Sequence, residues 1–223
     1  ILMEKDLPLS LSALSGEAIA GLGLPVERAA SVLRETLAFY QSRLQGYLEG
    51  RGVAADLSAA AIASGWDDLR DLKRRLEAFR GLAGSEILMA AATVVERTGN
   101  ILRPARPLPP GEIRDDLLKE PEEASLWEAY RVRASSVREA IGRGEYRLAT
   151  ELYADAFSRP LHDFFDRVMV NVEDEGLRLN RLRLLDAVNR LYAEPVPDLS
   201  LLQYERGEHL FSGAVAGGDR SGK

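Results

Sequence analysis

The sequence predicts an all-α fold, arranged as a multi-helix bundle in two halves that a proline-rich hinge joins. Apolar residues recur at helical spacing along most of the chain, and no segment shows the period-two alternation of a strand. Residues 104–111 contain four prolines, which remove backbone donors and cannot continue a helix. With 223 residues, 46% of them hydrophobic, the chain can bury one sizeable core or two small ones.

The first half, residues 25–103, contains three predicted helices. An apolar stripe predicts a helix over 25–49, which the segment Gly50-Arg51-Gly52 ends. Similar stripes predict helices over 69–79 and 87–102.

In the second half, residues 112–206, the first predicted helix begins at Pro121, because proline suits the first position of a helix. Glu122 and Glu123 follow it, near the positive end of the helix dipole. The helices predicted here span 121–141, 145–172 with an interruption or kink at Pro160, and 174–192.

Both ends of the chain lie outside these halves. The sequence begins at Ile1 without a methionine, so we expect a piece of a longer protein and interpret residues 1–24 as the end of a preceding body. Residues 207–223 are rich in glycine and are expected to be disordered.

Composition excludes several classes of protein. No run of eighteen apolar residues could form a transmembrane helix, and no basic-then-apolar start resembles a signal peptide. We therefore expect no membrane partner. The absence of cysteine excludes disulfides and fits a cytoplasmic protein. The net charge of −6 argues against binding of nucleic acid. Two segments are nevertheless basic: residues 70–106 hold eight basic and four acidic residues, and residues 178–190 hold four basic residues and one acidic residue. Either a polarised RNA-docking surface or a mixed solvated surface fits these counts.

No catalytic constellation is visible in the sequence. The dipeptide His162-Asp163 resembles that of metal-dependent phosphohydrolases, but the only other histidine is His209, so no metal site is expected. Residues 217–223 match GxxxxGK by chance, because no Ser or Thr follows and neither a strand nor a helix flanks them. We therefore predict that this chain does not catalyse a reaction by itself.

Six ordered motifs resemble a known family. The run from Phe164 to Leu185, FFDRVMVNVEDEGLRLNRLRLL, resembles the signature helix pair of the DALR anticodon-binding domain, in the form found in bacterial glycyl-tRNA synthetase β subunits. Gly176 departs from the better helix former usual in that family. The other five similar segments are Ile1–Leu9, Leu37–Leu44, Arg97–Leu102, Leu117–Pro121 and Asp198–Gln203.

This resemblance implies an all-α domain that binds the anticodon region of tRNA-Gly within a glycine–tRNA ligase. It implies as partners the α subunit and the remainder of the β subunit, and it places ATP and Mg at the α subunit, with no cofactor in this chain. Glycine anticodons end in two cytosines, which need acceptors for their amino groups, donors for their ring acceptors and aromatic side chains for stacking.

Candidate tRNA contacts come from several predicted helix faces. Thr93, Arg97 and Asn100 line up opposite an apolar stripe, and Phe39 with Arg43 could form a stacking platform. Packing, capping or solvation explains each of them equally simply, as it does Trp66 and Trp127, which we interpret as core or interface residues. The remaining candidates are Lys73, Arg74, Arg103, Asn180, Arg183 and Arg190.

Arg178 and Arg181 fall on or beside the apolar arc of the last predicted helix. Because an unpaired buried charge is costly, we expect a structural ion-pair network with Asp174, and with Asp166 or Asp163, as acceptors.

Two other functions stay open at this point. The chain could be a helical subunit-interaction module without RNA contact. It could also be the anticodon-binding domain of an arginyl or cysteinyl type of synthetase, which shares the Arg97–Leu102 and DALR-like elements.

Overall fold

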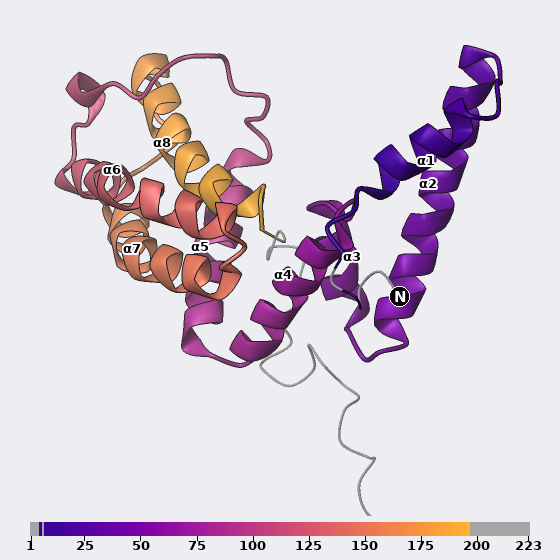
Figure 1. The fold of residues 1–223 in the computed structure, drawn as a ribbon. Helices are drawn as coiled ribbons and strands as arrows, with labels where there is room; N and C mark the ends of the chain where they lie inside the picture. Colours follow the sequence, from indigo (N-terminus) through magenta and orange to yellow (C-terminus); the bar gives the residue numbers. More distant parts are fainter. Residues whose placement is uncertain (1–4, 6, 197–223) are drawn as a thin grey trace, which may run out of the picture. The chain divides into compact units, whose positions relative to one another are not determined.

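The computed structural model describes residues 5 and 7–196, and all described regular structure is helical apart from one isolated bridge between Ser10 and Asp68. The chain divides into two compact units between Arg80 and Gly81. The predicted all-α class is therefore confirmed (Figure 1). Among the described residues, no single helix is both long and apolar enough to span a membrane.

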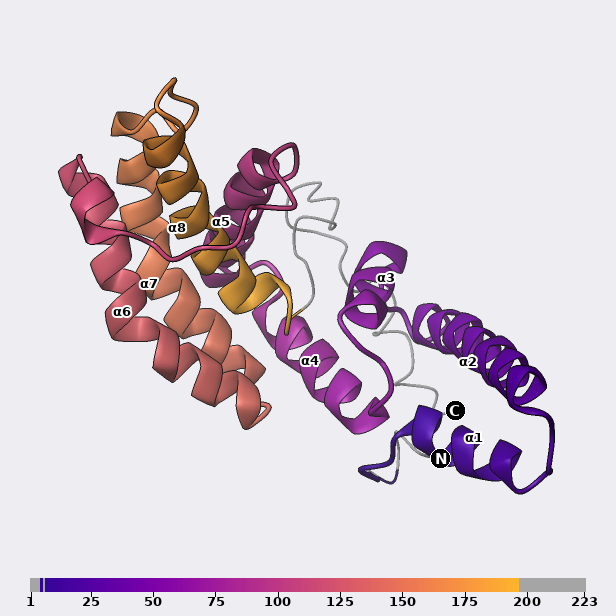
Figure 2. The same cartoon turned by 90° about the horizontal axis from the view of Figure 1, so that it is seen from above.

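The first unit is built from α1 (Leu11–Ala20), α2 (Val26–Glu49), α3 (Ala55–Ala63) and α4 (Leu69–Leu82). Helices α1 and α2 run side by side as a hairpin, and α3 packs against α2 (Figure 2). The side chains buried in this unit include Leu48 on α2, Leu57 on α3 and Leu72 on α4. Asp67 fixes the start of α1, because its carboxylate accepts hydrogen bonds from the Ser12 backbone N–H at 2.6 Å and from the Ser10 and Ser12 hydroxyls.

The second unit contains α5 (Glu86–Leu102), a 3-10 turn η1 (Asp115–Leu117), α6 (Pro121–Gly142), α7 (Tyr146–Arg167) and α8 (Glu175–Ala193). Helix α7 packs between α6 and α5, and α8 contacts both α5 and α6. At the centre, the buried rings of Tyr153 and Tyr192 stack with centroids 4.6 Å apart. This aromatic pair joins α7 to α8.

The structure corrects three expectations about the chain's organisation. Helix α7 continues through Pro160, because buried neighbours such as Phe157 and Phe164 hold it against the core and offset the local cost of proline. Helices α1 and α3 were not predicted. The boundary between units lies at Arg80–Gly81 and not at 104–111, because α5 packs on α7 and α8. The predicted tail 207–223 and the Asp198–Gln203 motif lie outside the described residues.

Candidate nucleic-acid interface

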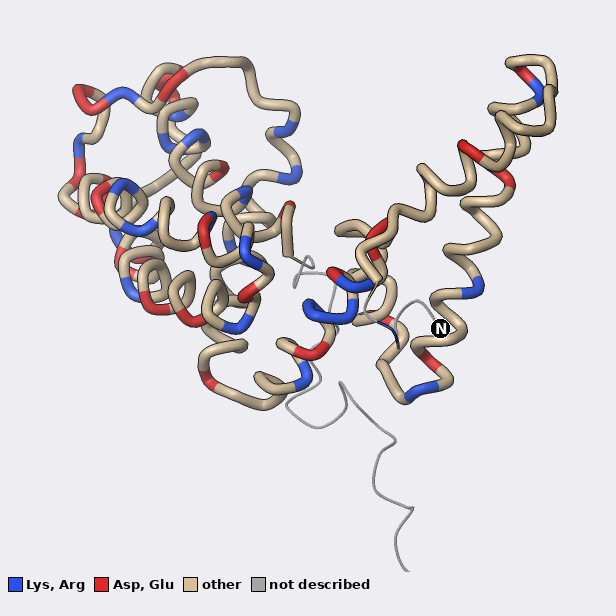
Figure 3. Tube along the Cα trace, viewed as in Figure 1, with Lys and Arg blue, Asp and Glu red and all other residues tan. Residues whose placement is uncertain are grey.

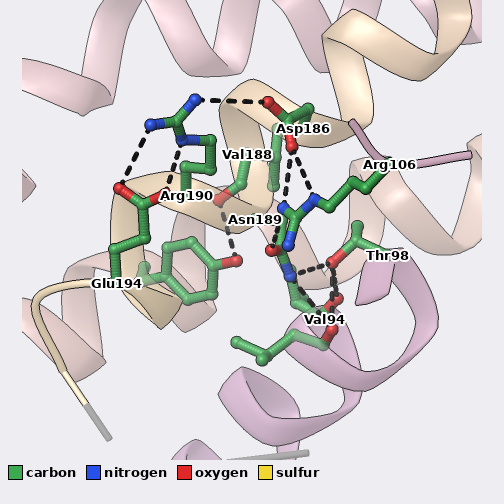
Figure 4. A network of polar contacts seen from close by, with 10 residues as sticks. Val94, Thr98, Arg106, Asp186, Val188, Asn189, Arg190 and Glu194 are labelled. Carbon is green, nitrogen blue, oxygen red and sulfur yellow. Dashed lines mark hydrogen bonds and ion pairs between the residues drawn. The ribbon is translucent and has the colours of Figure 1, made fainter. Parts of the chain in front are cut away.

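The proline-rich segment is tied to α8 and does not act as a hinge between the units. We call residues 103–114 the strap. The Arg106 guanidinium donates to Asp186 Oδ1 at 2.7 Å and to Asn189 Oδ1 at 3.0 Å (Figure 4). Arg183 donates to the carbonyl of Pro110 at 3.1 Å.

Asn180 completes the attachment of the strap to α8. Its side-chain oxygen accepts from the Arg114 backbone N–H at 2.7 Å, and its amide donates to the Arg114 carbonyl at 3.0 Å. Because Asn180 is fully buried, these two bonds satisfy the amide and fix the end of the strap. Four α8 side chains therefore hold the strap: Asn180, Arg183, Asp186 and Asn189.

Between the strap, α6 and α8 lies an open hollow of about 1230 Å³, which we call the strap groove. Its charged lining combines four guanidinium groups with three carboxylates, contributed by Arg106, Arg138, Arg183, Arg190, Glu112, Asp186 and Glu194. Elsewhere, cationic and anionic residues interleave along the helices of both units (Figure 3).

Asp186 on α8 and Glu194, the residue that follows α8, orient Arg190. Its Nε lies 2.7 Å from Glu194, and its Nη1 lies 3.8 Å from Asp186. The hydrogen bond to Glu194 and the charges of both acids raise the pKa of Arg190 above its ordinary value. Arg190, which lines the groove, is therefore held in place by two carboxylates.

The α6 wall of the groove is aromatic. Trp127 and Tyr130 stack with ring centroids 5.4 Å apart and planes inclined by 15°. Arg138 lies over the Tyr130 ring at 5.6 Å and donates to its hydroxyl at 2.6 Å, while Arg131 lies over Trp127 at 5.7 Å. The indole Nε1 donates to Asp115 at 2.8 Å, which fixes the ring. Such a wall suits the stacking of unpaired bases.

Sequence reasoning missed Tyr130, Arg106 and Arg138 as groove residues and interpreted Trp127 as a core or interface residue. Trp127 is only half-buried. One pattern in the sequence could have indicated the aromatic wall. Trp127 and Arg131 are four residues apart on one helix, a spacing that brings a guanidinium over an aromatic ring.

A buried ion pair links α6 and α8, two helices that line the groove. Arg181 is 5% exposed, and its Nε lies 2.8 Å from the fully buried carboxylate of Glu123. Arg181 also donates to the Met169 carbonyl at 2.8 Å, and Glu123 accepts the backbone N–H groups of Lys119 and Glu120 at 2.8 Å each. The pair connects α8 to the first turn of α6.

The acceptor of this pair differs from the expected ones. Asp174 caps α8 by accepting the Leu177 N–H at 2.9 Å, and Asp166 lies 3.3 Å from His162. Arg178 is 43% exposed and lies 4.0 Å from Glu175. Of the two predicted arginines, only Arg181 is buried in a structural ion pair.

Residues 92–195, which contain the whole strap groove, match the family of the DALR anticodon binding domain. This chain contains a DALR anticodon-binding domain. Its first helix is largely α5, which explains why the domain crosses the predicted hinge.

Known relatives resemble the chain over a longer range. It is 34% identical over 206 residues to the glycine–tRNA ligase beta subunit of Actinobacillus pleuropneumoniae, covering 91% of this chain and 29% of that protein. It is 37% identical over 202 residues to the Acidobacterium capsulatum beta subunit, covering 86% and 28%. The chain therefore spans less than a third of the length of these relatives.

The DALR domain has a second hollow, of about 560 Å³, between α5 and α7. Two predicted tRNA contacts, Thr93 and Arg97, line it. The Arg97 guanidinium lies 4.6 Å from the centre of the Phe165 ring, and no described carboxylate lies within ion-pair distance of it. Asn100 and Arg103 are exposed near the end of α5 and line neither hollow.

The other predicted contacts lie in the first unit, before the DALR domain. Phe39 and Arg43 are exposed on α2, with the guanidinium 5.4 Å from the ring centre. On α4, Lys73 lies 3.9 Å from Glu77, and Arg74 is exposed. Among the described residues, no group of three or more His, Asp or Glu side chains is arranged to hold a metal ion.

Proposed function

We propose that this chain binds the anticodon region of tRNA-Gly as part of a glycine–tRNA ligase β subunit, with the anticodon bases in the strap groove. The observation that carries the proposal is the meeting of the stacked Trp127–Tyr130 wall with four arginines inside a DALR domain. The named relatives are glycine–tRNA ligase β subunits, which supports glycine over an arginyl or cysteinyl type of synthetase.

The groove supplies the chemistry that two cytosines require. Trp127 and Tyr130 can stack against bases pulled out of the anticodon loop. Arginines can donate to the cytosine ring acceptors or to phosphates. Asp186 and Glu194 already pair with arginines, whereas Glu112 is exposed on the strap and has no ion-pair partner among the described residues. Glu112 is therefore the best acceptor for a cytosine amino group.

We further propose that the remainder of the β subunit and the α subunit are the protein partners. On this proposal, ATP- and Mg-dependent activation of glycine takes place on the α subunit, and the present chain contributes recognition without catalysis. A cytoplasmic location follows, because that is where bacterial tRNA is charged.

The test compares the affinity of the chain for tRNA-Gly and for the same transcript with a swapped anticodon, at fixed salt. Unpaired polar groups cost about 1–3 kcal/mol each, so the native anticodon should bind at least about five-fold more tightly. Arg138→Gln, in the groove, should weaken binding of tRNA-Gly, whereas Arg133→Gln, exposed on the same helix outside the groove, should not. Equal affinities of the wild-type chain for both transcripts would refute anticodon recognition.

A second candidate is a docking site for another protein chain on the first unit. At the α1–α2 turn, Leu22 is 66% exposed and Val26 is 86% exposed. Such apolar exposure favours a subunit-interaction role for this hairpin. Replacing both residues with serine should weaken assembly with the other chains of the ligase and leave tRNA affinity unchanged.

A further inference from the structure

One arginine of the strap groove is held by the fold in a fixed orientation. The Arg106 guanidinium donates through Nε and Nη2 to Asp186 Oδ1 at 3.2 and 2.7 Å, and Nη2 also donates to Asn189 Oδ1 at 3.0 Å (Figure 4). Its third nitrogen, Nη1, makes no hydrogen bond to any described residue. Because Arg106 is 44% exposed and lines the groove, this nitrogen can donate to a ligand.

The asparagine that accepts from Arg106 has a single possible orientation. Asn189 is 4% exposed, and its amide nitrogen donates to the Val95 carbonyl at 3.2 Å and to the Thr98 hydroxyl at 3.0 Å. The Thr98 hydroxyl proton is directed to the Val94 carbonyl at 2.7 Å, so its oxygen accepts from Asn189. The side-chain oxygen of Asn189 must therefore face Arg106. Through this buried amide, α5 and α8 together determine where the strap arginine lies.

Arg106 and Arg138 differ in how their charges are compensated. The Asp186 carboxylate lies 2.7 Å from Arg106, whereas Arg138 contacts the Tyr130 ring and hydroxyl and has no described carboxylate within ion-pair distance. An oriented and compensated guanidinium suits a hydrogen bond to one fixed acceptor, because it cannot follow a changed base. An exposed and uncompensated one suits a phosphate, which binds through charge.

We infer that Arg106 reads the Watson–Crick edge of an anticodon cytosine, that Asn189 is its positioning residue, and that Arg138 holds a phosphate without reading sequence. Cytosine has two ring acceptors on that edge, N3 and O2, to which Nη1 of Arg106 can donate. Uracil carries a proton on N3, so this donor would meet another donor and lose its hydrogen bond. The inference rests on the proposed function, because it assigns roles within the strap groove.

A transcript in which uracil replaces the two anticodon cytosines tests these roles in the full chain. Arg106→Lys keeps the charge but lacks the planar fork that spans Asp186 and Asn189. It should lower the preference for cytosine about five-fold or more, the effect of one unpaired polar group, and leave the slope of log K against log salt unchanged. Arg138→Gln should keep the preference and reduce the magnitude of the slope by about 0.7–0.9 for both transcripts, the value for one phosphate.

Two substitutions of Asn189 separate positioning from stability. Asn189→Asp and Asn189→Ala both remove the donor to the Val95 carbonyl, so both should lower the free energy of unfolding in urea. The aspartate keeps an acceptor for Arg106, and the alanine does not. Asn189→Asp should therefore retain most of the preference for cytosine, and Asn189→Ala should lose most of it. An equal loss in the two folded variants would overturn the positioning role.

The remaining outcomes distinguish this inference from the proposed anticodon reading. A preference that persists in folded Arg106→Lys would overturn the assignment of Arg106 and leave anticodon reading standing. So would a preference that disappears in Arg138→Gln with an unchanged slope, because Arg138 would then be the reader. A wild-type chain that binds both transcripts equally would refute anticodon reading and, with it, the role of Arg106.

Discussion

The Arg181–Glu123 pair shows how a charge can be retained in the core of the DALR domain. Replacing Arg181 with methionine would leave the fully buried Glu123 carboxylate without its counter-charge. Removing one partner of a buried pair costs about 3–5 kcal/mol, so we expect a loss of that size in the free energy of unfolding, measured in urea.

Arg178→Met is the matched control for this prediction. Arg178 lies three residues earlier on α8, is 43% exposed and lies 4.0 Å from Glu175, so its loss should cost at most about 1 kcal/mol. Similar costs for the two variants would mean that the buried pair contributes no more than a surface contact.

The sequence predicted half of this arrangement. The apolar arc of the last helix indicated that an arginine there must be paired, and Arg181 is paired. It could not identify Glu123, because the two residues are 58 positions apart and Glu123 also suits the N-terminal dipole of α6. Only the packing of α8 against α6 brings them together.

Asp67 gives the first unit a pH dependence. Burial raises the pKa of its carboxyl group, but hydrogen bonds from Ser10 and Ser12 outweigh that effect and lower the pKa below its usual value. A depressed folded-state pKa stabilises the fold above the unfolded-state value of about 3.9, and this contribution is lost as the pH falls through the folded-state pKa. Asp67→Asn should therefore destabilise the chain at pH 6 more than at pH 3 in urea titrations. A difference that is constant over this range would contradict the assignment.

At the scale of elements, the strap depends on close contact with α8. Gly111 has φ +154°, and an added Cβ would collide with the Arg183 guanidinium that bonds the strap carbonyls. Gly111→Ala should therefore strain the backbone, displace Arg183 and destabilise the chain by about 1 kcal/mol or more. Urea unfolding checks this, and weaker tRNA-Gly binding should accompany it.

Gly142→Ala supplies the control, because an added Cβ at this last residue of α6 meets no atom within 4 Å. Alanine is also the better helix former, so this variant should be as stable as the wild-type chain or slightly more stable. Equal stability of the two alanine variants would show that the strap tolerates displacement of Arg183.

Elements were predictable where their apolar residues follow one helical face. Helices α2, α4, α5, α6 and α8 lie close to their predicted spans for this reason. Helices α1 and α3 were missed because they are short and apolar on most sides, which leaves no clear stripe. The strap groove was not predictable, since it exists only where a loop, α6 and α8 meet.

At the scale of the whole molecule, the sequence placed the division at the prolines because they interrupt the helical pattern. The structure places it earlier, since α5 buries Leu88, Val95 and Leu102 against the helices that follow the strap. Asn189 strengthens this packing by donating to the Val95 carbonyl at 3.2 Å and to the Thr98 hydroxyl at 3.0 Å. Local breaks in a pattern therefore do not identify unit boundaries, because long-range burial determines them.

The division between the two units predicts which fragments of the chain can fold by themselves. A fragment of residues 81–200 should fold cooperatively into a helical domain, whereas residues 104–200 should not. The shorter fragment lacks α5, and the contacts of each fully buried leucine or valine contribute about 1.5–3 kcal/mol against a typical domain stability of about 5–15 kcal/mol. Circular dichroism during urea unfolding distinguishes the two, and equally cooperative unfolding of both would restore the hinge interpretation. The longer fragment should also keep the preference for the native anticodon, because it retains the strap groove.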